Sequence, residues 1–85
     1  ETAEVYSGMG YSQFDLNGFQ RALESFNKAL EINDAHQGAL FGMGMTYEEL
    51  GKKEMAVEYY QKYLDRYPKG TEARAAQASI DRLKR

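Results

Sequence analysis

An all-α fold built from repeated helical hairpins is predicted for this chain by two observations. First, the tripeptide Gly-Met-Gly at residues 8–10 occurs again at residues 42–44, and Ala22 matches Ala56 at the same offset of 34 residues. A fixed offset of this size along most of a chain is the signature of stacked repeats. Second, apolar residues recur at helical spacing, while no segment alternates apolar and polar residues as a strand would. The chain is therefore expected to contain two copies of one helical unit and a remainder.

Five helices are expected, one for each segment with apolar residues at helical spacing. These segments cover residues 5–16, 22–30, 40–50, 56–64 and 73–83. In the second segment, positions i, i+1, i+4, i+7 and i+8 are apolar, which places them on one face of a helix. The last segment has no partner after it, and its outward side is polar, as suits the end of a repeat stack.

Short turns are expected between these segments. The Asn-Gly pair at residues 17–18 and Gly51 tolerate the left-handed backbone that ends a helix, and Pro68 interrupts the chain before the last segment. Asp34, with Gln37 three residues later, is predicted to cap the third helix. Connections this short make successive helices antiparallel.

One domain, residues 1–85, is expected, with a first repeat at about 3–34, a second at about 37–68 and a capping helix at about 71–84. A chain of this length can bury a core without disulfide bonds or metals, which agrees with the absence of cysteine. A chain without cysteine is equally suited to the cytosol and the periplasm. Because the chain lacks an initiator methionine and opens almost directly into a repeat, we expect a segment of a longer protein.

Each copy resembles a tetratricopeptide repeat, whose pattern is W-x2-L-G-x2-Y, then A-x3-F, then P. The matching residues are Tyr6, Met9, Gly10, Ala22 and Phe26 in the first copy, and Leu40, Met43, Gly44, Tyr47, Ala56, Tyr60 and Pro68 in the second. The resemblance implies a right-handed α-solenoid fragment, in which the first helix of each repeat lines a concave side and the second lines the convex side.

Three positions depart from this pattern. Gln13 replaces the usual aromatic residue, Asp34 replaces the usual proline, and Tyr63 replaces a small residue. Tyr63 is expected to face the small Ala73 and Ala76 of the last helix, because a large residue opposite small ones keeps the core volume near normal.

Charge and hydropathy disfavour two classes of partner. The formal net charge is −2, with acidic and basic residues interspersed, so no basic field exists for nucleic acid or an anionic membrane. No apolar run approaches the roughly 20 residues that span a bilayer, and the first residues are too polar for a signal sequence. We expect neither nucleic acid nor a membrane as a partner.

No constellation for catalysis is recognisable. His36 is the only histidine and is expected to be solvent-exposed, and no serine lies at helical spacing from it. Gly8 and Gly10 belong to a helical pattern with no strand before them, so they do not form a phosphate-binding loop. We therefore expect no catalytic residue, no metal site and no cofactor, and we do not expect an enzyme.

A partner-binding groove is predicted on the concave side, where residues of the first helices lie off the packing stripe. The candidate groove residues are Ser7, Gly8, Tyr11, Phe14, Asp15, Phe41, Gly42, Met45, Glu48, Glu49, Arg74 and Arg82, with Ala75 and Ala78 between the arginines. Exposed apolar residues on one face mark an interaction surface. The alternative is that some of the aromatic residues fill the contact between repeats. The acidic residues either form a solvated helix face or bind a basic side chain.

Gly8 and Gly42 recur at the same place in both repeats, although a glycine inside a helix costs roughly 0.5–1 kcal/mol relative to alanine. One interpretation is that they keep the groove floor bare for a partner. The alternative is that both copies inherited a tolerated glycine from one duplicated ancestor. On either interpretation, replacing each glycine with alanine should raise stability.

The predicted function is a non-catalytic protein-protein interaction module that holds a partner segment in an apolar, acid-rimmed groove. The alternative is a structural spacer or homo-oligomerising segment of a larger repeat protein. Val5 and Tyr6 on the uncovered side of the first helix are expected to support self-association.

Overall fold

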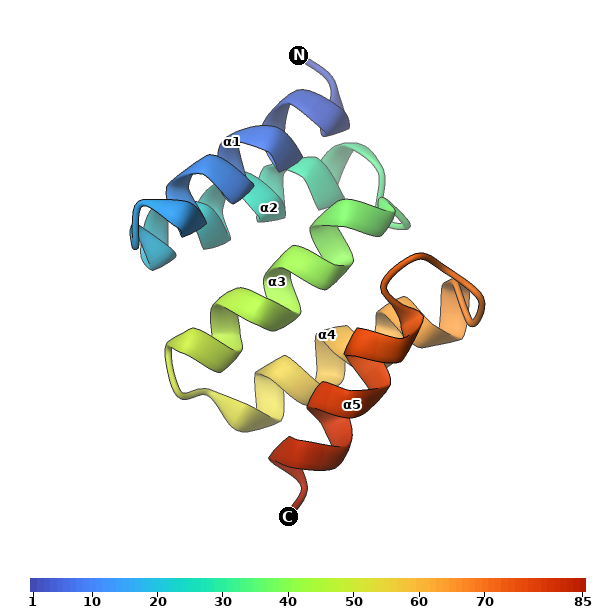
Figure 1. Cartoon of the computed structure of the whole chain (residues 1–85). Helices are drawn as coiled ribbons and strands as arrows, with labels where there is room; N and C mark the ends of the chain where they lie inside the picture. Colours follow the sequence, from blue (N-terminus) through green and yellow to red (C-terminus); the bar gives the residue numbers. More distant parts are fainter.

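Two antiparallel helical hairpins followed by a single helix make up the computed structural model, which describes residues 1–85 (Figure 1). The helices are α1 (Ala3–Asp15), α2 (Phe19–Ile32), α3 (Gln37–Glu49), α4 (Lys53–Arg66) and α5 (Ala73–Leu83). α1 pairs with α2 and α3 with α4, while α2 also contacts α3 and α4 contacts α5. The structure contains no strand, so the predicted all-α hairpin stack is confirmed.

The two turns inside the hairpins use the same backbone device. Asn17 has a φ of 64° and Gly51 a φ of 76°, and these two residues are equivalent across the repeat offset. Asparagine and glycine are the residues that most readily adopt this left-handed conformation. The predicted helix ends are therefore confirmed.

The predicted cap of α3 is wrong. His36 occupies the N-cap position, and its Nδ1 accepts a hydrogen bond from the Ala39 backbone N–H at 3.2 Å. The Asn33 side chain accepts a hydrogen bond from the Ala35 backbone N–H at 3.1 Å and so forms a turn before the helix. Asp34 lies within this turn and is exposed. His36 is half-buried rather than exposed. An N-cap residue stands directly before the first residue of a helix. Asp34 lies two residues too early in the chain to take that position.

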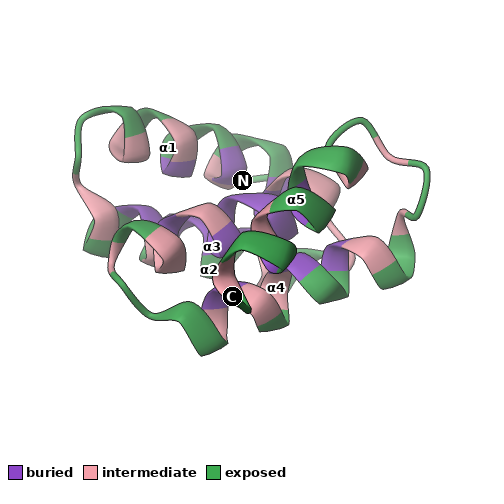
Figure 2. Cartoon of the chain, turned by 60° about the horizontal axis from the view of Figure 1, so that its bottom comes forward, coloured by how far each residue is buried: buried purple, intermediate pink, exposed green.

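α3 is the central helix of the molecule. Seven of its residues are buried, and Figure 2 shows them along a helix that lies between the others. Ala39 and Met43 belong to the apolar cluster formed with α1 and α2, whereas Leu40 and Phe41 belong to the cluster formed with α4 and α5. A helix that is apolar on several sides is a buried one.

The Phe26 ring of α2 lies in a slot between two glycines, Gly10 of α1 and Gly42 of α3. Phe26 is fully buried. A methyl group at Gly10 would lie 2.7 Å from its ring, and one at Gly42 would lie 2.4 Å from it. Both distances are far below van der Waals contact, so only a hydrogen atom fits at either position. We call this arrangement the glycine slot.

The glycine slot overturns the predicted position of Gly42 in the groove floor. Gly42 is buried against the preceding hairpin, and its replacement by alanine should lower stability rather than raise it. Gly44, by contrast, is the glycine of the repeat pattern and lies against α4, where a methyl group would be 2.7 Å from the Tyr60 ring.

Tyrosine hydroxyl groups tie the beginning of α3 to the helices around it. The Tyr11 hydroxyl donates to the Gly38 carbonyl at 2.5 Å, and the Tyr67 hydroxyl donates to the Ala35 carbonyl. The Tyr63 hydroxyl accepts from Gln37 Nε2 at 3.0 Å. No buried side-chain polar atom lacks a partner, which is the normal condition of a well-formed core.

Tyr63 is accommodated as the sequence predicts. It is fully buried and shares a cluster with Ala76 and the partly buried Ala73 of α5. Its hydroxyl also accepts from the Glu72 backbone N–H at 2.9 Å, so the aromatic side chain fixes the beginning of α5. Gly70 lies against that hydroxyl, where a methyl group would come within 2.4 Å.

Replacing Ala22 or Ala56 with leucine should destabilise the protein by about 1–3 kcal/mol, because overpacking a closed site forces side chains and backbone to move. Both alanines are fully buried. Thermal unfolding followed by circular dichroism measures the effect. Ala78→Leu, at an exposed position of α5, is the matched control and should leave the melting temperature nearly unchanged. Equal melting temperatures for all three variants and the parent would contradict this packing.

Stability should fall as the pH rises through about 10 to 12. Burial, assisted by the Glu72 carboxylate, raises the pKa of the Tyr11 hydroxyl to about 12 from its ordinary value of 10.0. Unfolded tyrosine ionises near pH 10, while folded Tyr11 keeps its proton to about pH 12. The contribution of Tyr11 to the free energy of unfolding is therefore complete below pH 10 and is lost as the pH rises to about 12. Denaturant unfolding at several pH values should show a shallower alkaline loss in Tyr11→Phe. Parallel losses in parent and variant would contradict the assignment.

Candidate partner-binding groove

A hollow of about 310 Å³ opens on the side of the molecule formed by α1, α3 and α5. Its lining residues are Phe14, Phe41, Met45, Glu48, Glu49, Tyr60, Ala75, Ser79 and Arg82. Three successive odd-numbered helices thus contribute to one surface, as expected for the first helices of stacked repeats. Its volume is at the lower end of the range for ligand sites and suits one large side chain of a partner.

Glu48 is the best-anchored side chain of this hollow. Its Oε1 accepts a hydrogen bond from the Tyr60 hydroxyl at 2.8 Å, and its Oε2 pairs with the Arg82 guanidinium. Burial, together with the hydrogen bond to Glu48, raises the pKa of the Tyr60 hydroxyl above its ordinary value. Since both carboxylate oxygens are occupied, Glu48 joins α3, α4 and α5 and is not a free acidic group of the rim.

Glu49 and Asp15 remain as the free acids of the predicted rim. Both side chains are exposed, and neither takes part in an ion pair, because the ion pairs of the structure are Lys62 with Glu58 and Arg82 with Glu48. Glu49 lines the hollow, whereas Asp15 lies outside it. The open acidic contact of the hollow is therefore Glu49.

Phe14 and Met45 provide the half-buried apolar wall. The Phe14 ring packs edge-on against Phe19 with ring centres 5.3 Å apart, which holds it at the end of α1. Met45 is an unbranched, polarisable side chain that adapts to the shape of what it contacts. An adaptable methionine beside an anchored ring forms a surface able to receive an apolar side chain.

Three predicted groove residues lie in the core instead. Ser7 is 4% exposed, and Phe41 is 8% exposed with its ring centre 5.6 Å from that of Tyr60. Gly42 faces the Phe26 ring. The reason is the same for all three. α3 is packed on nearly all sides, and the face of α1 that packs against it is buried as well. Phe41 presents only part of its side chain to the hollow.

The remaining predicted residues, Tyr11, Gly8 and Arg74, do not line the hollow. Tyr11 packs edge-on against Phe26 with ring centres 4.9 Å apart and is committed to the hydrogen bond with Gly38. Gly8 and Arg74 are exposed but do not line the hollow. These positions are therefore outside the candidate site as the structure forms it.

Two lining residues were not predicted. Ser79 lies three residues before Arg82 and four after Ala75, so the helical stripe of the arginine and the alanine already contained it. Tyr60 matches the aromatic position of the repeat pattern and its ring lies in the core, but its hydroxyl reaches Glu48. Nothing in the spacing of the sequence indicates that second role.

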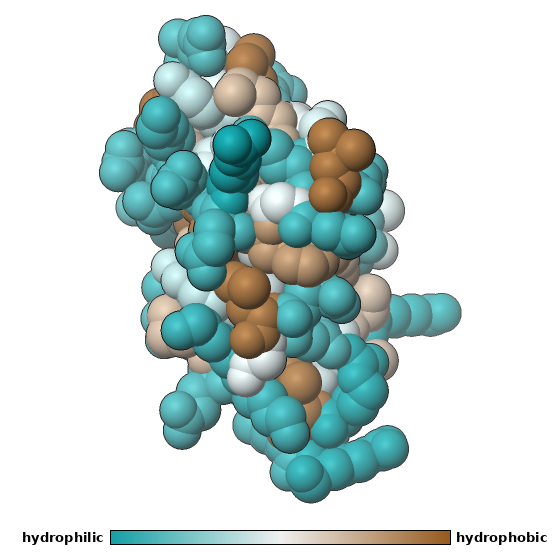
Figure 3. Space-filling view, turned by 90° about the vertical axis from the view of Figure 1, so that its left-hand side faces the viewer, coloured by the Kyte–Doolittle hydropathy of each residue, from teal (hydrophilic) through white to brown (hydrophobic).

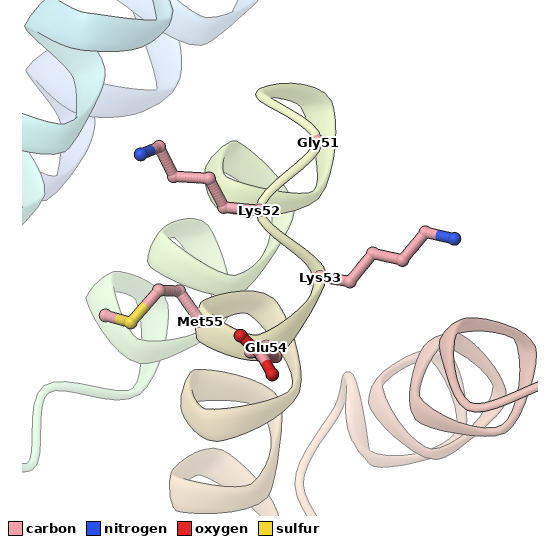
Figure 4. A pocket seen from close by; sticks show the side chains of 5 residues that line it. All are labelled: Gly51, Lys52, Lys53, Glu54 and Met55. Atoms are coloured by element: carbon pink, nitrogen blue, oxygen red, sulfur yellow. The ribbon is translucent and has the colours of Figure 1, made fainter.

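A larger hollow, about 500 Å³, is not a comparable site. It is formed by five consecutive residues at the beginning of α4, Gly51 to Met55. Figure 4 shows the side chains of Lys52 and Lys53 extending away from each other. Groups that diverge from one short segment cannot converge on a ligand.

The face that carries the α1–α2 and α3–α4 turns offers no continuous apolar patch. Figure 3 shows this face as mainly hydrophilic, with apolar residues in small separate groups. Scattered apolar residues of this kind are normal for a protein surface. None of the helices combines the length and the apolar content needed to cross a bilayer.

Two stretches of the chain match family models described as tetratricopeptide repeat, residues 3–36 and residues 38–70. The chain is 37% identical over 62 residues to a TPR repeat-containing protein of Methanocaldococcus jannaschii, covering 73% of this chain and 19% of that protein. It is 34% identical over 58 residues to an uncharacterized protein of the same organism, covering 68% of this chain and 67% of that protein.

A third relative is anaphase-promoting complex subunit 3 of Schizosaccharomyces pombe, 28% identical over 58 residues, which is 68% of this chain and 9% of that protein. The chain spans 19% and 11% of two M. jannaschii relatives that carry the repeat in their names. The consecutive family matches, the helical hairpins and the repeated residue pattern show that this chain belongs to the tetratricopeptide repeat family.

Proposed function

We propose that this chain is a non-catalytic interaction module that holds a segment of a protein partner in the hollow between α1, α3 and α5. Tetratricopeptide repeats mediate protein-protein interaction, and the family is typically non-catalytic. The observation that carries the proposal is the combination of a half-buried apolar wall, Phe14 and Met45, with the unpaired carboxylate of Glu49 at its edge.

The lining determines the chemistry of the partner segment. Burial of an apolar side chain against Phe14 and Met45 contributes about 25 cal/mol per Å² of area removed from water. A lysine or arginine next to it in the partner reaches Glu49, which gives orientation and faster association more than affinity. The favoured partner is therefore a short segment with a large apolar residue beside a basic one.

A structural role in a larger array is the second candidate, and one observation favours it. Val5 is 47% exposed and Met9 is 43% exposed on the outer side of α1, a location that a neighbouring element or a second molecule would cover. A spacer would show no saturable binding of peptides at the hollow, so the same experiment separates the two functions.

Peptides selected by phage display on the folded chain should contain an apolar residue next to lysine or arginine. We expect Glu49→Lys to weaken the binding of these peptides about three- to tenfold, because one exposed ion pair is lost and a repulsion replaces it. Met45→Ala should weaken binding about tenfold through lost apolar contact. Fluorescence anisotropy with synthetic peptides measures both effects.

Matched controls are available on other faces. Glu24→Lys makes the same charge change on α2, and Met55→Ala makes the same truncation at the beginning of α4, both outside the hollow. These two variants should bind the peptides like the parent. Equal losses in groove and control variants, or no saturable binding of any selected peptide, would refute the proposed groove.

A further inference from the structure

We infer that the groove between α2 and α4 is a second docking surface, which takes a protein segment with an apolar residue between two basic ones. Two adjoining hollows of about 210 and 330 Å³ form it, and they share Asp34, Leu40 and Lys62. We call this surface the α2/α4 groove. It has no residue in common with the hollow between α1, α3 and α5. In Figure 1, α2 and α4 lie behind the other three helices, so the two surfaces are on different sides of the molecule.

The base of the α2/α4 groove is apolar and comes from three helices. Leu30 of α2, Leu40 of α3 and Tyr59 of α4 line it. Leu40 is 3% exposed and closes the bottom, whereas Leu30 and Tyr59 are half-buried. The Tyr59 ring is stacked on the Tyr47 ring with ring centres 5.7 Å apart, so its orientation is fixed before a partner binds. A preformed apolar base of this kind binds a side chain with little loss of conformational entropy in the protein.

The charged residues around this base are mainly acidic. Glu31 lines one hollow, Asp65 lines the other, and Asp34 lines both. Lys62, the basic residue that the two hollows share, is paired with Glu58 at 3.3 Å. Its charge is therefore matched within the protein, whereas Asp34 has no ion-pair partner.

The groove carries an excess of negative charge as large as that of the whole chain. Its ionisable residues, with the Glu58 that pairs with Lys62, are Glu31, Asp34, Glu58, Asp65, Lys62 and Arg66. Four acids and two bases leave a formal charge of −2, which equals the net charge of the 85 residues. Since the remaining acids and bases balance, the excess is concentrated at this groove and attracts a basic segment to it.

The helix ends add to this negative potential. α2 ends at Ile32 and α4 at Arg66, so the C-terminal halves of both helices form the walls. The carbonyl groups at a helix C-terminus carry partial negative charge and favour a nearby cation. α4 has Arg66 in its last turn, but α2 has no basic residue there. A basic side chain of the partner supplies the missing cation at the end of α2.

The positions of the acids set the pattern of the partner segment. Glu31 belongs to the α2 wall and Asp65 to the α4 wall, so an apolar side chain seated on the base has an acidic residue on each wall. A segment with basic residues before and after its apolar residue therefore meets both walls.

A second copy of this chain is a poor occupant, although it carries such a triplet, Arg82-Leu83-Lys84. Arg82 is already paired with Glu48, and Leu83 packs against the apolar cluster of α3, α4 and α5. Docking of a second copy would require the loss of these contacts.

Titration of the ¹⁵N-labelled chain with the capped peptide Gly-Arg-Leu-Arg-Gly, followed by two-dimensional NMR, tests the groove. The Glu49→Lys variant serves as the parent, so that binding at the hollow between α1, α3 and α5 is weakened. We expect saturable shifts of the backbone amide signals of Leu30, Asp34 and Lys62. The peptide Gly-Gln-Leu-Gln-Gly keeps the apolar residue without the charges and should bind at least tenfold more weakly.

Asp34→Lys should weaken binding of the arginine peptide about tenfold, because Asp34 lines both hollows. Lys62→Glu should strengthen it about fivefold, since the shared basic residue of the groove becomes a further acid. Asp81→Lys makes the same charge change at an exposed position of α5 and is the matched control, which should bind like the parent. All three positions are exposed, so the circular dichroism of each variant should equal that of the parent.

Equal binding of the two peptides, shifts confined to α1, α3 and α5, or equal losses in Asp34→Lys and Asp81→Lys would overturn the α2/α4 groove as a docking surface. A dimer of the chain that Asp34→Lys dissociates would also overturn it, since a second copy would then be the occupant. Because the shifts are resolved residue by residue, these outcomes do not depend on whether the hollow between α1, α3 and α5 binds a partner.

Discussion

The position of the Phe26 ring between Gly10 and Gly42 is the constraint on which the rest of the structure depends. The ring belongs to α2, but it contacts the backbone of α1 on one side and that of α3 on the other. Because glycine has no side chain, the three helices approach one another closely at these two positions. The buried ring removes a large apolar surface from water. A single aromatic residue thus joins the fold of the first hairpin to its packing on the second.

The candidate groove is a consequence of how α3 is held. The glycine slot fixes one side of α3, and the contacts of Phe41 with Tyr60 and Tyr63 fix the other, with ring centres 5.6 and 5.7 Å apart. The third side of α3, which includes Met45 and Glu49, is left to line the hollow. The ion pair of Glu48 with Arg82 then places α5 as the far wall of the hollow. The surface offered to a partner is small because most of α3 is used for packing.

The helices, their order and the hairpin turns could be predicted from the sequence, because helical periodicity and the left-handed tolerance of Asn17 and Gly51 are local properties. The environment of each repeat is not local. Gly8 and Gly42 recur at the same place in the two repeats, yet one is exposed and the other lies under an aromatic ring, since α2 packs on α3 at Gly42 and no helix of the structure packs over Gly8. The same limit applies to Ser7, which is buried because α3 packs against this part of α1. His36 caps α3 after a turn that the Asn33 side chain forms, whereas N-cap propensity alone favours Asp34.

A double-mutant cycle between Gly42→Ala and Phe26→Leu tests the central role of the glycine slot most directly. In the parent, Gly42→Ala should reduce the free energy of unfolding by about 1–3 kcal/mol, because the methyl group meets the Phe26 ring. Leucine does not reach as far as the ring, so the same substitution should cost at least about 1 kcal/mol less in Phe26→Leu. Gly8→Ala should have the same effect in both backgrounds. Denaturant unfolding that gives an equal cost for Gly42→Ala with and without the Phe26 ring would contradict the account.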